Sequence, residues 1–273
     1  MLGDVLPLLA CPHCGGPLSQ PGRSVACANG HSFDVGRQSY VSLLPGDARL
    51  GSADTAEMVA AREAFLGAGH FEPLAEALGA EADRAGLPDG CVVDLGAGTG
   101  WYLARVLDRL PGRVGLALDL SKHALRRAAR AHPRIGAAAC DAWRDLPVRD
   151  SVAALVLSVC APRNGAEIAR VLRPDGALVV VTPTERHLAE LVSTLGLLTV
   201  DERKRERLAA GLDPHLELER RVEREWSLRL APADVANAVA MGPSARHVAP
   251  EVPGSHMAAT ASLAISTYRK RLL

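Results

Sequence analysis

Three cysteines and one histidine near the N-terminus have the residue types and spacing of a zinc site. Cys11 and Cys14 form a C-x-x-C pair, and Cys27 and His31 follow as a C-x-x-x-H pair. Zinc prefers four tetrahedral nitrogen and sulfur ligands, and two ligand pairs on facing turns are a common way to supply them. Because protein side chains would fill all four positions, the pattern predicts a structural zinc that is closed to substrate.

Two other interpretations of these residues stay open. A redox-active C-x-x-C pair normally begins a helix in a thioredoxin-like unit, whereas the Gly-Gly-Pro after Cys14 favours a turn. Free thiols with no partner are the simpler alternative. His13 lies inside the first pair, so His31 is the better fourth ligand. A segment this small cannot bury a core large enough to fold alone, and a metal would supply the missing stability.

A second group of residues with the pattern of a binding site lies between Cys91 and Leu110. A short apolar run ends at Asp94 and breaks into Gly-Ala-Gly-Thr-Gly, after which apolar residues recur at helical spacing. This predicts a buried strand, a glycine turn and the N-terminus of a helix. The glycines leave room for a ligand against the backbone, and the helix start offers free N–H groups. The candidate binding residues here are Asp94, Gly96, Gly98, Thr99 and Gly100.

The pattern D-x-G-x-G-x-G resembles motif I of class I S-adenosylmethionine (SAM) methyltransferases. It is not the dinucleotide form G-x-G-x-x-G, and no GK[ST] follows as in a phosphate-binding loop. The resemblance implies that the loop passes under the methionine part of SAM and that an acid after the next strand binds the ribose hydroxyls. Asp119 ends the apolar run 114–118, at that place. A glycine turn without a ligand is the alternative, and this second acid argues against it.

Strand-like and helix-like segments alternate after residue 91, which predicts a parallel sheet with crossover helices. We therefore expect an α/β, Rossmann-like class I SAM methyltransferase fold with a mostly parallel seven-stranded sheet and a small N-terminal zinc-binding module. The third expected strand, 135–139, leads to Asp141, the usual position of the acid that accepts the adenine amino group. Expected strands at 221–230 and 258–268 would complete the sheet with an antiparallel edge.

The segment E-M-x-x-A-R-x-x-F-L-x-x-G-H-F-x-P-L at residues 57–74 resembles the linker of the RlmA family of 23S rRNA guanine-N1 methyltransferases. The zinc spacing and the glycine motif match as well, so the resemblance spans essentially the whole chain. It is strongest to the Gram-positive RlmA(II) branch, which includes a tylosin-resistance enzyme. The resemblance implies that Phe71 lies over bound SAM, and that His187, in an R-H-L turn, lines the SAM pocket. Glu57, Arg62 and His70 would line the approach to the cofactor.

The resemblance also implies an organisation and a substrate. Residues 1–50 would form a zinc-binding RNA-recognition module, 51–90 a helical linker, and 91–273 the methyltransferase domain. The substrate would be N1 of guanine 748, or alternatively the neighbouring guanine 745, in a hairpin of domain II of 23S rRNA. Methylation would contribute to tylosin-type macrolide resistance. A homodimer is expected from the resemblance alone.

The catalytic group stays unassigned. The fourth expected strand, 152–159, delivers residues 160–164 to the carboxyl edge of the sheet, where a target base should meet the methyl group. Amino-methylating enzymes carry [DNS]-P-P-[YFW] there, but this chain has Cys160-Ala161-Pro162. Cys160 is either a nucleophile or, as we prefer, a buried structural thiol. Guanine N1 needs no covalent intermediate, so positioning with a modest base suffices, and no single carboxylate stands out as that base.

The composition limits the remaining classes of function. Lysines plus arginines equal aspartates plus glutamates at 31 each, so any RNA binding must rest on a local patch. No signal peptide or membrane-spanning run is evident, and we expect a soluble cytoplasmic protein with no membrane partner. A small-molecule methyltransferase with a structural zinc ribbon would need an aromatic-lined pocket, and aromatics are only 3%. A non-catalytic RNA-binding protein is disfavoured because the glycine motif and both of its acids are intact.

Overall fold

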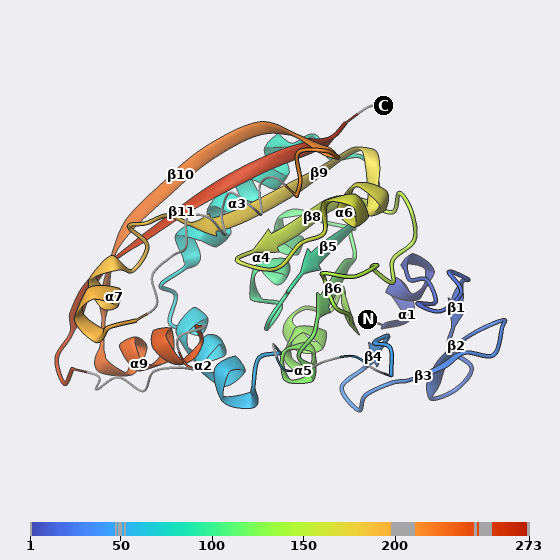
Figure 1. Ribbon diagram of the computed structural model, residues 1–273, viewed down its shortest axis with the longest axis horizontal. Coiled ribbons are helices and arrows are strands. Elements are labelled where there is room, and N and C mark those ends of the chain that lie inside the picture. The colour runs from blue at the N-terminus through green and yellow to red at the C-terminus, as the bar shows by residue number, and fades with distance from the viewer. Residues whose placement is uncertain are drawn as a thin grey trace.

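An eight-stranded sheet forms the centre of the computed structural model, in the order β10-β11-β9-β8-β5-β6-β7-β4 (Figure 1). The structure describes residues 2–46, 48, 51, 53–197, 211–242, 245 and 253–271. The strands are β4 (Tyr40–Ser42), β5 (Cys91–Leu95), β6 (Gly115–Asp119), β7 (Ile135–Ala139), β8 (Ala153–Val159), β9 (Leu172–Pro183), β10 (Leu216–Leu230) and β11 (Met257–Lys270). The β10–β11 and β11–β9 pairs are antiparallel, and the other pairs in this sheet are parallel. The predicted α/β class and its antiparallel edge are therefore confirmed.

The sheet has one strand more than the seven predicted. The additional strand is β4, which comes from the N-terminal segment and pairs in parallel with β7, with Val41 opposite Ala138. A three-residue strand does not reveal its pairing partner in the sequence, and here that partner lies far along the chain. The methyltransferase sheet is thus extended by a strand that immediately follows the zinc-binding residues.

Helices cover both faces of the sheet (Figure 1). They are α2 (Ala56–Gly67), α3 (Glu72–Arg84), α4 (Trp101–Arg109), α5 (Lys122–Ala131), α6 (Gly165–Val171), α7 (Ala189–Leu195) and α9 (Pro232–Ala240). Side chains of α3, α4, α5 and α9 join the apolar core on one face, whereas α6 and the N-terminal helix join the core on the other. Among the described residues, no helix is both long and apolar enough to cross a membrane.

The N-terminal segment is a small unit attached to the edge of the large sheet. It contains α1 (Leu2–Val5), the 3-10 helix η1 (Leu6–Leu8) and a three-stranded antiparallel sheet of β1 (Leu18–Ser19), β2 (Ser24–Cys27) and β3 (Ser32–Asp34). Val5 packs so closely on β7 that a Cβ added at Gly136 would lie 2.2 Å from its Cγ2. The Ala10 amide donates to the Pro147 carbonyl at 3.1 Å. These contacts fix the unit against the methyltransferase sheet.

Candidate metal centre and cofactor site

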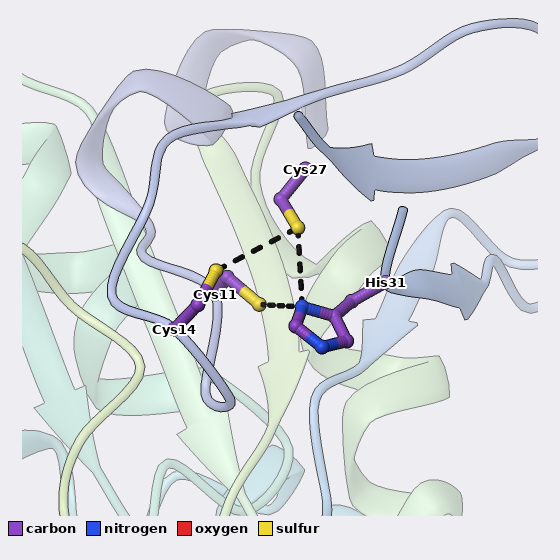
Figure 2. A group of neighbouring side chains, drawn as sticks. All are labelled: Cys11, Cys14, Cys27 and His31. Carbon is purple, nitrogen blue, oxygen red and sulfur yellow. Dashed lines mark hydrogen bonds between the residues drawn. The ribbon is translucent and has the colours of Figure 1, made fainter. Parts of the chain in front are cut away.

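The four predicted zinc ligands come together at the end of the small sheet (Figure 2). Nδ1 of His31 lies 3.5 Å from Sγ of Cys11 and 3.3 Å from Sγ of Cys27, and Cys14 Sγ lies 3.7 Å from Cys27 Sγ. Zn–S bonds of about 2.3 Å and Zn–N bonds of about 2.0 Å give a tetrahedron whose edges are about 3.8 Å between sulfurs and about 3.5 Å between sulfur and nitrogen. The observed separations match these edges, so the site fits zinc.

Two tight turns present the ligands. In the first, the Gly15 amide donates to the Cys11 carbonyl at 2.8 Å; in the second, the Gly30 amide donates to the Cys27 carbonyl at 3.1 Å. A hydrogen bond from the Gly16 amide is the main cause that lowers the pKa of the Cys14 thiol to about 6, which favours the thiolate that zinc requires. A turn, and not a helix, follows Cys14, which argues against the redox interpretation.

His13 lies beside the cluster without joining it. Its ring stacks on Phe33, with centroids 5.9 Å apart, and its centroid lies 5.0 Å from that of His31. The structure groups His31, and not His13, with the three cysteines.

The glycine turn is tied to the end of β6. The Gly98 amide donates to Oδ2 of Asp119 at 2.8 Å, and the Ser121 amide donates to its Oδ1 at 2.7 Å. The Gly96 amide donates to the Leu118 carbonyl at 2.8 Å. Each carboxylate oxygen of Asp119 retains a lone pair, so this acid both shapes the turn and can accept hydrogen bonds from a ligand.

Asp94 is buried beneath the turn, with 2% of its surface exposed. Burial, and then the negative charge of Asp119, raise the pKa of Asp94 well above its usual value. Burial also raises the pKa of Asp119, while the hydrogen bonds from Ser121 and Gly98 oppose that effect. One buried and one partly buried carboxyl group at the same turn suit a ligand that brings hydroxyl donors or positive charge.

The third glycine of the turn is required by both its backbone angle and its contacts. Gly100 has a φ of 74°, and a Cβ there would lie 2.9 Å from the Cα of Ala128 and 3.1 Å from its Cβ. A left-handed conformation costs a non-glycine residue about 1–3 kcal/mol, before any steric clash. We expect Gly100→Ala to lower the free energy of unfolding by at least about 2 kcal/mol in urea titrations. Gly112→Ala, with a φ of 81° and no neighbour within 4 Å, is the matched control and should cost less. Equal losses in both variants would contradict the packing argument.

Phe71 and His187, the two residues expected to line the SAM pocket, lie against each other. The Phe71 ring is 5% exposed and meets His187 edge-on, with centroids 6.0 Å apart; it also meets Trp226 at 5.5 Å. The Ser262 amide donates to Nδ1 of His187 at 3.2 Å. Burial lowers the pKa of His187 to about 4. The ring is therefore neutral at pH 7, and because Nδ1 accepts a hydrogen bond, Nε2 carries the proton.

The low pKa of His187 predicts an acid-dependent loss of stability. The pKa falls from 6.5 to about 4 on folding, so the unfolded chain binds the extra proton first as the pH drops. This contribution to stability is complete above pH 6.5 and is lost progressively as the pH falls towards about 4. In His187→Gln, melting temperature should therefore decline less steeply with pH across this window than in the wild type. The same decline of melting temperature with pH in His187→Gln and in the wild type would contradict this prediction. His256→Gln, at an exposed histidine, is the control.

The residues expected to line the cofactor approach have different surroundings. Arg62 pairs with Asp54 and donates to the Met241 carbonyl at 2.9 Å, and it lies 3.5 Å from a Cβ built on Gly98. It therefore covers the middle of the turn. Nε2 of His70 lies 3.1 Å from Oδ2 of Asp234. Glu57 is exposed in the first turn of α2.

Asp141 follows β7, next to the end of β6. Its Oδ1 accepts a hydrogen bond from the Trp143 amide at 3.0 Å, and the Cys140 amide donates to the Asp119 carbonyl at 3.1 Å. The two acids therefore follow neighbouring strands at one edge of the sheet, as predicted from the sequence.

Cys160 and Tyr102 complete this edge. Cys160 has a φ of 52° and an exposed side chain, yet the surrounding protein raises the pKa of its thiol to about 11. A thiol with this pKa is protonated at pH 7, which argues against the nucleophile interpretation. Our expectation that Cys160 is buried was wrong, because its side chain is exposed.

Tyr102 was missed by the sequence analysis, which took it only as part of a helix. It is the second residue of α4, directly after the glycine turn. Burial, and then the charge of Cys160, raise the pKa of its hydroxyl well above the usual value, and Arg62 and Asp94 also act on it. Its place after Gly100 was the available signal.

Comparisons with known proteins agree with both sites. The family model described as "RlmA, N-terminal" matches residues 9–49, and the model described as "Methyltransferase domain" matches residues 92–176. The chain is 50% identical to a putative 23S rRNA (guanine-N(1)-)-methyltransferase of Micromonospora griseorubida, covering 97% of this chain and 98% of that one. It is 51% identical to the 23S rRNA (guanine(748)-N(1))-methyltransferase of Streptomyces fradiae, covering 94% and 95%. The chain belongs to the RlmA family of 23S rRNA (guanine-N1)-methyltransferases.

Membership of the RlmA family confirms the resemblance found in the sequence. A more distant member, the putative 23S rRNA (guanine-N(1)-)-methyltransferase YxjB of Bacillus subtilis, is 31% identical over 67% of each chain. The zinc-ribbon match and the methyltransferase-domain match identify structural zinc and SAM as the cofactors of this RlmA protein.

Proposed function

We propose that this RlmA protein transfers the methyl group of SAM to N1 of guanine 748 in a hairpin loop of 23S rRNA. The observation that carries the proposal is the 51% identity to the Streptomyces fradiae guanine-748 enzyme, which extends over 94% of the chain. The similarity therefore includes the zinc-binding segment, the linker and the methyltransferase fold. The proposal extends to the hairpin in domain II, to a cytoplasmic site of action, to a contribution to tylosin-type resistance and to a homodimer, as the family resemblance implies.

The four clustered side chains are proposed to hold the zinc, and the glycine turn to hold SAM. When bound, SAM supplies an electrophilic methyl group on a sulfonium. Asp119 would accept hydrogen bonds from the ribose hydroxyls, since its two oxygens are already oriented by the Gly98 and Ser121 amides. Asp141, on the neighbouring strand end, would accept the adenine amino group. Phe71 and the neutral His187 would close the pocket and exclude water. The proposed turn residues are Asp94, Gly96, Gly98, Thr99 and Gly100.

Residues 1–50 are proposed to recognise RNA, with 51–90 as the linker and 91–273 as the catalytic domain. The zinc-binding unit leads directly into β4, and the Leu43 amide donates to the Ala139 carbonyl at 3.1 Å. The chain thus leaves this unit at the sheet edge where β6 and β7 end. That geometry supports a hairpin held by the zinc unit and a target base presented at the same edge.

The proposal is tested with hairpin transcripts and labelled SAM. We expect methyl transfer to the wild-type hairpin and to a transcript with guanine 745 replaced by adenine, and none when guanine 748 is replaced. The reverse dependence would move the target to guanine 745. Transfer to neither the hairpin nor intact 23S rRNA would overturn the proposal and favour a small-molecule acceptor.

A further inference from the structure

The loop that follows β8 lies directly on the glycine turn. A Cβ added at Gly96 would come within 2.5 Å of the Cβ of Ala161 and 3.8 Å of Cδ of Pro162. The Cys160 amide donates to the Val181 carbonyl at 3.0 Å, which joins the loop to β9. Ala161 and Pro162 are therefore held against the turn proposed to bind SAM, and Arg163 follows them in the chain.

Within this loop, Arg163 is buried, and its Nε is unsatisfied among the described residues. Arg163 is only 6% exposed, and its Nε has no hydrogen-bond partner in the described part of the chain. No described carboxylate forms an ion pair with it either. Burying an unpaired guanidinium is costly, and a buried polar group left unsatisfied in a native protein calls for an explanation. An unsatisfied N–H of this kind calls for a hydrogen-bond acceptor.

The position of Arg163 in the sequence indicates what that partner is. Amino-methylating enzymes carry [DNS]-P-P-[YFW] after this strand, and Cys160-Ala161-Pro162-Arg163 has the same spacing. Arg163 thus occupies the place of the aromatic residue. A guanidinium is also planar and stacks on bases, but in addition it donates two parallel hydrogen bonds to O6 and N7 of guanine.

We propose that Arg163 binds the target guanine through O6 and stabilises the anion that guanine forms when N1 loses its proton. This inference rests on the proposed function. The N1 proton passes to solvent water, and the N1 electron pair forms the new bond to the methyl carbon. The methyl–sulfur bond of SAM breaks with its electron pair on sulfur, which leaves a neutral thioether. A cation at O6 lowers the pKa of N1, so the reaction needs no dedicated carboxylate base.

This role accounts for two features of the site. No carboxylate among the described residues 160–164 is available as a base, because that loop holds none. Adenine carries an amino donor at position 6 in place of an acceptor, so the guanidinium would repel it.

The titratable groups whose charges act on Arg163 are Cys160 and Tyr268. The surrounding protein raises the pKa of the Cys160 thiol to about 11, so it stays neutral at pH 7 and does not neutralise the guanidinium.

The test measures the N1 pKa of the target guanine directly. A hairpin with ¹⁵N at N1 of that guanine is titrated by NMR in complex with the protein and S-adenosylhomocysteine, so no reaction occurs. We expect the wild type to lower the N1 pKa by at least about one unit, the scale of a close opposite charge. R163M should return it to the free-hairpin value, and R163K should keep part of the shift. R229M, which removes an exposed charge on β10, is the control and should match the wild type.

Single-turnover rates provide the second measurement. R163M should be slower than wild type by at least about tenfold at pH 7, because one pKa unit corresponds to a tenfold population change. The difference should shrink as the pH approaches the N1 pKa of free guanine, about 9. If R163M does not fold, R163Q, which keeps a donor but no charge, carries the test.

The outcomes separate the two proposals. A wild-type complex without an N1 shift, or an R163M rate reduced equally at every pH, overturns the role of Arg163. If the N1 shift is present but the wild type transfers no methyl group to RNA, the proposed function fails while the contact to guanine stands.

Discussion

Asp119→Ala should strongly weaken SAM binding while zinc remains bound. The Asp119 carboxylate accepts the Gly98 and Ser121 amides and, in our proposal, the ribose hydroxyls. Hydrogen bonds to a charged group are worth about 1.5–3 kcal/mol each. Losing the ribose contacts and the order of the turn should weaken SAM binding at least about 100-fold, or about 2.7 kcal/mol. Calorimetric titration with SAM and a zinc assay of the same sample measure both effects.

Two further variants test whether the loss of SAM affinity is specific to the Asp119 carboxylate. Asp119→Asn keeps one acceptor oxygen, so it should bind SAM with intermediate affinity. Asp108→Ala removes an acid from α4 whose side chain is 69% exposed, so SAM affinity should be unchanged. Wild-type affinity in Asp119→Ala would show that the turn does not hold the ribose at this acid.

Cys27→Ala should lose the zinc and unfold the small N-terminal sheet, with SAM binding retained. This sheet has strands of two to four residues, too little to fold without a metal. Structural zinc contributes about 10–16 kcal/mol in small zinc-binding units, and three ligands retain only part of it. We expect near-complete loss of zinc, rapid hydrogen exchange at residues 9–36 and loss of RNA methylation.

His13→Ala is the matched control, because His13 lies between two ligands but outside the cluster. It should keep its zinc and its slow hydrogen exchange. If Cys27→Ala remained folded and active on RNA, the metal centre would not have the structural role assigned to it. If His13→Ala lost zinc and His31→Ala kept it, the fourth ligand would be the wrong histidine.

Most of the sheet could be predicted because buried parallel strands are apolar runs. The expected strand 135–139 is β7 to the residue, and 152–159 differs from β8 only at Val152. β9 begins at Leu172 and runs through the turn-forming sequence Arg-Pro-Asp-Gly at 173–176. Its pairing with β8 is irregular there, because Leu172 pairs with Ala153 but Ala177 pairs with Leu155.

Long-range contacts and burial were harder to predict. The pairing of β4 with β7 depends on a partner far along the chain. The zinc ligands followed from spacing alone, because coordination chemistry fixes both residue type and separation. In contrast, nothing in the sequence showed that Arg163 is buried with an unsatisfied Nε or that the Tyr102 hydroxyl is surrounded by protein. Phe71 and His187 were predicted only through the family resemblance. Residues 201–210 and most of the 243–252 segment lie outside the described residues.

The most direct test of the central claim is the identity of the methylated nucleoside. Unmodified 23S rRNA is incubated with the zinc-loaded protein and methyl-labelled SAM, digested to nucleosides and analysed by mass spectrometry. The account predicts labelled N1-methylguanosine, absent in Asp119→Ala. Label in N2- or N7-methylguanosine, or no label in RNA, would contradict it.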